Sequence, residues 1–136
     1  MMEIVNQLAN PPKNIKLHTT VRDSKYHVLR DQDESGLFGQ REAVREIFCM
    51  AFAIGYYFNE QKPIGKGSIN HVNIVSLDLE FKQLATLLIL KRKPDITDPK
   101  ELWKEIEIYA EYGIEVLFNS WKDKGILDIA DIFNKQ

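Results

Sequence analysis

The sequence has few of the residues that build disulfide frameworks, metal centres or membrane spans. Cys49 is its only cysteine, which excludes an intramolecular disulfide and is typical of proteins from a reducing compartment. The three histidines, His18, His27 and His71, lack the paired spacing of a zinc site. No run of about 18 uncharged apolar residues exists to form a membrane-spanning helix, and the N-terminus lacks the basic start and long apolar stretch of a secretory signal. We therefore expect a cytoplasmic protein without a metal or another cofactor.

Catalytic motifs are equally scarce. The turn at residues 63–68 contains Lys66 between two glycines but lacks the spacing of a phosphate-binding P-loop. No Gly-x-Ser-x-Gly elbow and no Cys/His signature is present. Glu105, Glu107 and Glu111 are close in sequence, but we expect them on a water-facing helix surface, where nothing raises a carboxyl pKa as general acid catalysis requires. The sequence predicts a protein that is not an enzyme, and only a site assembled from distant segments stays open.

What is present is the composition of one globular domain. The chain has 136 residues, of which 44% are hydrophobic and 28% charged, and this length encloses one core. We expect a mainly α fold, a compact bundle of three main helices with short terminal elements and a minor β-ribbon. Residues 1–14, which include Pro11 and Pro12, are expected to form a flexible leader, and residues 15–136 a single helical domain.

Three segments carry clear helix signals. Residues 40–58 are apolar over most of the helix circumference, which predicts a central helix, and Gly55 within it permits close approach of a neighbour. Residues 98–123 begin with the best local signal, the N-cap Asp98 followed by Pro99 and Glu101, and end at Gly125. Residues 78–91 form the third helix, and its apolar side is expected to consist of Leu79, Leu84, Leu87, Leu88 and Leu90.

Shorter elements complete the prediction. Residues 23–31 are expected to form a short helix, residues 31–39 a polar loop, and residues 127–133 a last segment that docks as a helix. Residues 69–76 alternate in the manner of a short strand, which needs a partner such as residues 15–21.

Charge is distributed unevenly along the chain. From Lys13 to Arg30 five bases accompany one acid, whereas from Leu77 onward twelve acids outnumber nine bases. Such asymmetry orients a protein on a polyanion or against a partner, although ordinary solvated faces produce it too. The pI near 5.9 argues against tight non-specific DNA binding. The residues expected to contact DNA or a partner protein are Lys16, Arg22, Lys25, Arg30, Lys62 and Lys66.

Four segments together resemble a known family: TVRDSKY at 20–26, IFCMAFAIGY at 47–56, KPI at 62–64 and IYAEYGIEVL at 108–117. They are similar to a small accessory family encoded beside bacterial DNA phosphorothioation (Dnd) systems, and the likeness covers residues 15–120. The resemblance implies a non-catalytic accessory or regulatory protein of DNA sulfur modification or the linked restriction and phage defence. Such a protein binds DNA or a protein of the modification and restriction complex, and the family offers no catalytic residues to carry over.

A second hypothesis stays open beside it. The chain is then a helical oligomeric regulator or structural subunit unrelated to DNA modification, in which apolar segments such as residues 127–133 pack between copies. An oligomer that is lost when the C-terminal segment is removed favours this hypothesis, and salt-dependent DNA binding through Arg22 and Lys25 favours the DNA form of the first.

Overall fold

The computed structural model describes residues 2–12, 15–33 and 43–134. These residues form α1 (Met2–Ala9), α2 (His27–Gln32), α3 (Ala43–Phe58), α4 (Leu79–Arg92), α5 (Pro99–Lys124) and α6 (Ile129–Asn134). Shorter elements are the strands β1 (His18–Thr19) and β2 (Ile69–Asn70), the π-helical turn η1 (Arg22–Tyr26) and the 3-10 turn η2 (Ile74–Ser76). The expected mainly α class is confirmed. Gln40 to Glu42 and most of the predicted loop at 31–39 lie outside the described residues.

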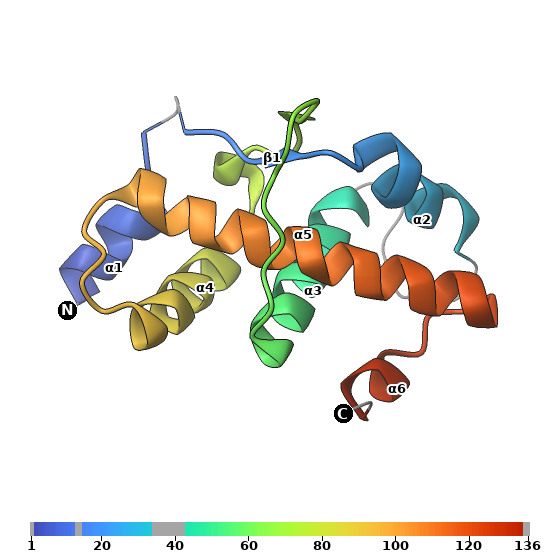
Figure 1. Ribbon diagram of the computed structural model, residues 1–136. Coiled ribbons are helices and arrows are strands. Elements are labelled where there is room, and N and C mark those ends of the chain that lie inside the picture. The colour runs from blue at the N-terminus through green and yellow to red at the C-terminus, as the bar shows by residue number, and fades with distance from the viewer. Residues whose placement is uncertain (1, 13–14, 34–42, 135–136) are drawn as a thin grey trace.

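The long helix α5 organises the molecule. Asp98 caps its N-terminus by accepting a hydrogen bond from the Lys100 backbone N–H (3.0 Å), Pro99 occupies the first turn, and Gly125 ends it in the left-handed conformation. Figure 1 shows α5 running across the whole molecule, with α1 and α4 beside its N-terminal half and α2 and α6 beside its C-terminal half. None of the helices in the described ranges has both the length and the apolar character required to cross a membrane.

The main packing contact is the crossing of α3 and α5. Gly55 and Gly113 lie where the two helices touch, and a Cβ atom on either glycine would overlap a backbone carbonyl, that of Tyr109 or that of Ala51 respectively. Because neither glycine has a side chain, the two backbones come into direct contact there. Ile47, Ile54, Ile106, Ile114 and Leu117 are fully buried. The central position predicted for the helix at 40–58 is confirmed from residue 43 onward.

The N-terminal segment differs from the prediction. A flexible leader at residues 1–14 is wrong for residues 2–9, which form α1 and pack against α4 and α5. Val5, Leu8 and Ala9 recur at helical spacing and are buried, and the Trp103 indole N–H donates a hydrogen bond to the Leu8 carbonyl (2.7 Å). The Lys82 ammonium holds the next turn by donating to the Asn10 side-chain oxygen (3.0 Å).

The buried side of α4 also differs from the prediction. Lys82, Ala85, Thr86 and Ile89 are buried, while Leu79, Leu84 and Leu87 are 50%, 57% and 40% exposed. The expectation that the leucines supply the packing side is wrong for these three. On the side of α4 that faces the N-terminal segment, Lys82 and Gln83 donate hydrogen bonds to Asn10 and Asn6 (3.0 and 3.1 Å), and Leu84 lies on the opposite side of the helix.

The predicted ribbon exists in a shorter form. β1 and β2 pair antiparallel, with His18 opposite Asn70 and Thr19 opposite Ile69. A strand over all of residues 69–76 is wrong, because Ile74–Ser76 forms the 3-10 turn η2 with Ile74 buried. The segment between α3 and β2 passes over α5, where the Lys62 backbone N–H donates a hydrogen bond to the Ile108 carbonyl (2.9 Å). Figure 1 shows this green segment crossing in front of α5.

Candidate binding surfaces

The basic residues predicted near the N-terminus contact carboxylates of their own segment. Arg22 Nε lies 3.5 Å from Asp23 Oδ1. Arg30 donates from Nε and Nη2 to the two oxygens of Asp31 (2.7 and 3.1 Å), and this pair raises the pKa of Arg30 and lowers that of Asp31. Each guanidinium therefore has a neighbouring negative charge that weakens its attraction for an external phosphate.

Two other predicted residues meet on α5. Lys62 Nζ lies 2.8 Å from Glu115 Oε2 and lowers the pKa of that carboxyl, to which Lys25 also contributes. Lys25 Nζ lies 5.7 Å from the centre of the Phe118 ring. Lys62 from the crossing segment and Lys25 from η1 are thus brought together around one acid. Lys16 precedes β1 and Lys66 lies in the turn before β2, and both are exposed.

The acidic residues of α5 do not form the water-facing surface that the sequence predicts. Glu111 is 3% exposed and accepts hydrogen bonds from Thr19 Oγ1 (2.5 Å), Thr20 N (3.0 Å) and Thr20 Oγ1 (2.7 Å). One turn earlier, Glu107 accepts a hydrogen bond from the His18 backbone N–H (2.7 Å). The prediction is wrong for Glu107 and Glu111 because β1 and the residue after it lie over this side of α5, a long-range contact that the spacing of the glutamates does not reveal. Glu105 instead pairs with Lys93 (2.7 Å).

The fold raises the pKa of the Glu107 carboxyl. Burial raises its pKa, while the hydrogen bond and charge of His18 oppose the rise and Glu111 adds to it. Two depressions, of about 310 and 470 Å³, share His18, Lys104 and Glu107. Lys16 and Lys100 also line the smaller one. Because the Glu107 carboxylate accepts from the backbone of β1, its role in this conformation is to hold the N-terminal strand on α5.

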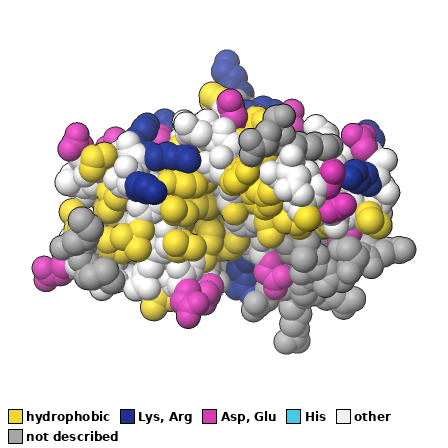
Figure 2. Space-filling view, turned by 90° about the horizontal axis from the view of Figure 1, so that it is seen from below, with side chains coloured by type: hydrophobic (Ala, Val, Ile, Leu, Met, Phe, Trp, Pro, Cys, Tyr) yellow, Lys and Arg dark blue, Asp and Glu magenta, His cyan; other side chains and the backbone are white. Residues whose placement is uncertain are grey.

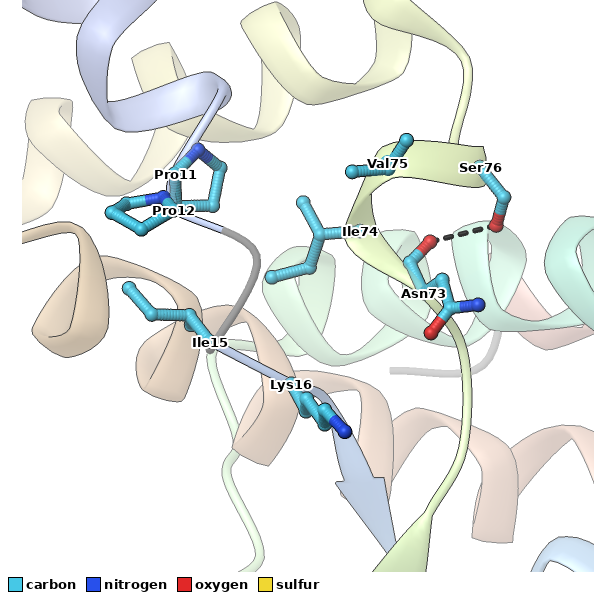
Figure 3. Close-up of a pocket in the computed structure, with 8 residues that line it drawn as sticks. All are labelled: Pro11, Pro12, Ile15, Lys16, Asn73, Ile74, Val75 and Ser76. Atoms are coloured by element: carbon cyan, nitrogen blue, oxygen red, sulfur yellow. Dashed lines mark hydrogen bonds between the residues drawn. The ribbon is translucent and has the colours of Figure 1, made fainter.

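A third depression lies between the N-terminal segment and η2. It has a volume of about 310 Å³ and is lined by Pro11, Pro12, Ile15, Lys16 and residues 73–76. Figure 3 shows the proline rings, Ile15 and Ile74 around it, with the Ser76 hydroxyl donating to the Asn73 carbonyl (2.7 Å). Its walls are mainly apolar, and Lys16 is the one ionisable side chain among the described residues that line it.

His71 is held neutral among aromatic rings. Its ring lies 4.1 Å from that of Tyr26 and 5.9 Å from that of Phe48. Burial, with help from the charges of Arg22 and His27, lowers its pKa to about 3. Neither ring nitrogen has a hydrogen-bond partner among the residues that the structure describes. A neutral ring packed in this way contributes to the core.

A mainly apolar groove lies between α3 and α4, and Phe133 of α6 lines one side of it. We call it the α3–α4 groove. It has a volume of about 440 Å³. Its lining residues are Cys49, Phe52, Ala53, Tyr56 and Tyr57 of α3, Phe81, Leu84, Ala85, Leu88 and Arg92 of α4, and Phe133 of α6. Figure 2 views the molecule from the side on which α3 and α4 lie in Figure 1, and hydrophobic side chains form a broad band across that face.

The Cys49 thiol, which lines this groove, has a raised pKa. Burial raises the pKa of Cys49 to about 12, and the nearby carboxylates Asp78 and Glu46 contribute. The thiol is therefore protonated at neutral pH and is a poor nucleophile. Within the three described ranges no group of three or more His, Cys, Asp or Glu side chains is placed to hold a metal ion.

The sequence reasoning missed the α3–α4 groove because it treated the leucines of α4 as core. One signal was available: the apolar residues of α4 are spread around the helix, so that some of them must face away from any single neighbour. No protein-family model, curated protein or solved structure matches this chain.

Proposed function

We propose that this protein is a non-catalytic accessory protein that binds a partner protein in the α3–α4 groove. The observation that carries the proposal is the placement of Leu84, which lines the groove and is 57% exposed, while Thr86 and Ile89 on the other side of α4 are buried. Exposed apolar surface of this kind, concentrated around a depression, is typical of protein interaction sites.

The arrangement of the basic residues favours a protein partner over DNA. Arg22 and Arg30 are near carboxylates of their own segment, and Lys25 and Lys62 share Glu115. Phosphate binding requires cations that are free to replace counterions. DNA contact is the second candidate, and it is favoured by the depression at which Lys16 lies with Lys100 and Lys104.

The biological setting follows from the resemblance alone. We infer that the partner belongs to a bacterial DNA phosphorothioation or restriction complex in the cytoplasm. Two of the segments that carry the resemblance, residues 47–56 and 108–117, contain Gly55 and Gly113 and so include the α3–α5 crossing. These segments contain helix-packing residues, so the resemblance rests mainly on how the helices pack.

The C-terminal segment has less apolar surface available for packing between copies than the oligomer hypothesis requires. Leu127 and Ile132 are buried in their own chain, and the Tyr57 hydroxyl donates a hydrogen bond to the Phe133 carbonyl (3.2 Å). The rings of Tyr57 and Phe133 lie 4.9 Å apart. α6 therefore uses much of its apolar side to close the groove.

A pull-down from the native host tests the proposal. The bait is the tagged protein, compared with Leu84→Asp in the groove and with Ile126→Asp, a control at a similarly exposed apolar residue (55%) outside it. We expect a protein that the wild type and Ile126→Asp retain and that Leu84→Asp loses. Retention by all three baits contradicts binding in the groove. Salt-dependent DNA binding lost in Lys16→Ala/Lys104→Ala supports the DNA candidate instead.

A further inference from the structure

We propose that the α3–α4 groove receives an amphipathic α-helix of the partner protein, with an acidic side chain of that helix paired to Arg92. This inference rests on the proposed function and specifies the chemistry of the partner.

The shape of the groove fits a helix. The lining residues recur every three or four positions on both α3 and α4, so each helix presents one continuous stripe. The stripes run in the same direction, because Phe81 at the start of α4 contacts Phe52 (5.8 Å between ring centres) and Arg92 at its end lies over the Tyr56 ring (3.5 Å). From Phe81 to Arg92 the groove is about 16 Å long, which matches about three helical turns.

The other common mode of peptide binding does not fit this place. An added strand needs an unpaired sheet edge, and the strands among the described residues, β1 and β2, contribute no residue to the lining of the groove. Figure 1 shows β1 across α5 from the C-terminal ends of α3 and α4. An apolar trough between two helices instead accepts a third helix through side chains at positions i, i+3 or i+4, and i+7.

Contacts with neighbouring side chains fix the position of the Arg92 guanidinium. Its guanidinium stacks on Tyr56, and Nη1 donates hydrogen bonds to Asn59 Oδ1 (3.1 Å) and to the Tyr109 hydroxyl (3.3 Å). The Tyr109 hydroxyl donates in turn to Asn59 Oδ1 (3.1 Å). Within the described part of the chain, Nε and Nη2 have no acceptor and no carboxylate forms an ion pair with Arg92. That edge of a guanidinium matches the two oxygens of a carboxylate.

Arg92 lies at one end of the groove and Cys49 lies toward the other. Near Cys49 both signs of charge are present, because Glu46 and Asp78 contribute to the raised pKa of the thiol and Arg45 Nη1 donates to the Ser76 carbonyl (3.2 Å). The charge that selects the partner is therefore that of Arg92, and an acidic residue at one end of the partner helix is complementary to it.

Synthetic peptides test this chemistry directly. We would use two helical peptides of about four turns, identical in a stripe of leucines, one ending in two glutamates and the other in two lysines at the same end. Fluorescence anisotropy against the full chain should show that the acidic peptide binds at least about tenfold more tightly, a difference of about 1.4 kcal/mol. Equal affinities overturn the pairing with Arg92. Each peptide is also tested with its sequence reversed, so that both directions of entry are sampled.

Charge reversal provides the matched variant. Arg92→Glu should invert the preference, so that the basic peptide binds more tightly, while Ile126→Asp leaves it unchanged and Leu84→Asp abolishes binding of both peptides. An acidic preference that survives Arg92→Glu overturns the inference. The thermal melting of each variant is measured beside its affinity, and since both peptides are compared on one variant, partial unfolding cannot by itself invert their order.

The outcomes separate the inference from the function on which it rests. If no peptide binds but Leu84→Asp still loses the native partner, the helix is wrong and the groove remains a binding site. If Leu84→Asp retains the native partner, the proposed function itself is wrong. A stable dimer in light scattering that Leu84→Asp dissociates places a second copy of this chain in the groove, and this result also overturns the inference.

Discussion

The two sides of α3 have similar apolar character and very different neighbours. On one side Gly55 meets α5 so closely that the helices touch through their backbones. On the other side Ala53 and Tyr57 are exposed, and α4 stands far enough away to leave a groove of about 440 Å³. Apolar content therefore identifies the surfaces that avoid water, and the shape of the neighbouring helix determines which of them the fold itself fills.

The largest effect on the free energy of unfolding is expected on the side of α3 that packs against α5. Gly113→Ala should lower the free energy of unfolding by more than about 4 kcal/mol or prevent folding, because its Cβ would overlap the Ala51 carbonyl and no flexible side chain is there to move. Urea denaturation followed by circular dichroism measures the change. The matched control is Gly65→Ala, where a Cβ meets no atom within 4 Å. Equal stability of the two variants would show that α3 and α5 are not in backbone contact.

A pair of leucines compares the two sides with one chemical change. Leu117→Ala should lower the free energy of unfolding by about 3 kcal/mol, since Leu117 is fully buried on α5 and its removal leaves a cavity. Leu84→Ala, at a side chain that is 57% exposed in the groove, should change it by less than about 0.5 kcal/mol. The same urea titration serves for both. A large loss for Leu84→Ala would mean that the groove is covered by the protein's own chain.

Local signals in the sequence predicted local structure well. Asp98, Pro99 and Gly125 fix the ends of α5 through contacts within a few residues, and the prediction needed no knowledge of the rest of the fold. Gly55 likewise indicated a close helix neighbour, although it could not indicate that the neighbour was Gly113.

Features that depend on distant contacts were missed. α1 has eight residues, too few for a stable isolated helix, and it is held by Trp103 and α4. Glu111 looked solvated because Thr19 and Thr20, which cover it, are about ninety residues away in the sequence. The α3–α4 groove was missed for the same reason, since α4 packs against α1 and α5, which are distant from it in the sequence or whose contacts its own pattern does not reveal.

The free energy of unfolding should depend on pH because of the buried His71. The unfolded chain binds a proton at this residue below about pH 6.5, whereas the folded chain does so only near its depressed pKa of about 3. The free energy of unfolding should therefore fall as the pH is lowered between these values, by at most about 1.4 kcal/mol per pH unit.

His71→Phe keeps an aromatic ring against Tyr26 and Phe48 and removes the proton site. Urea midpoints at pH 7, 6, 5 and 4 should show a shallower decline for this variant than for the wild type. Burial raises the pKa of Glu107, so its titration acts in the opposite direction, and Glu107→Gln measured in parallel separates the two contributions. Parallel curves for wild type and His71→Phe would show that His71 is reached by water.

The smallest effect concerns the end of the open side, where Arg92 stacks on Tyr56 at 3.5 Å. A double-mutant cycle of Arg92→Met and Tyr56→Leu should give a coupling of about 0.5–1 kcal/mol, the range of a partly exposed cation–π pair. The cycle cancels the hydrogen bond that the Tyr56 hydroxyl donates to the Leu88 carbonyl, because both Tyr56→Leu proteins lack it. Coupling near zero would mean that Tyr56 does not hold the guanidinium in place. The open side of α3 would then offer a partner an apolar groove without a fixed charge at its end, and the preference for an acidic helix would lose its structural basis.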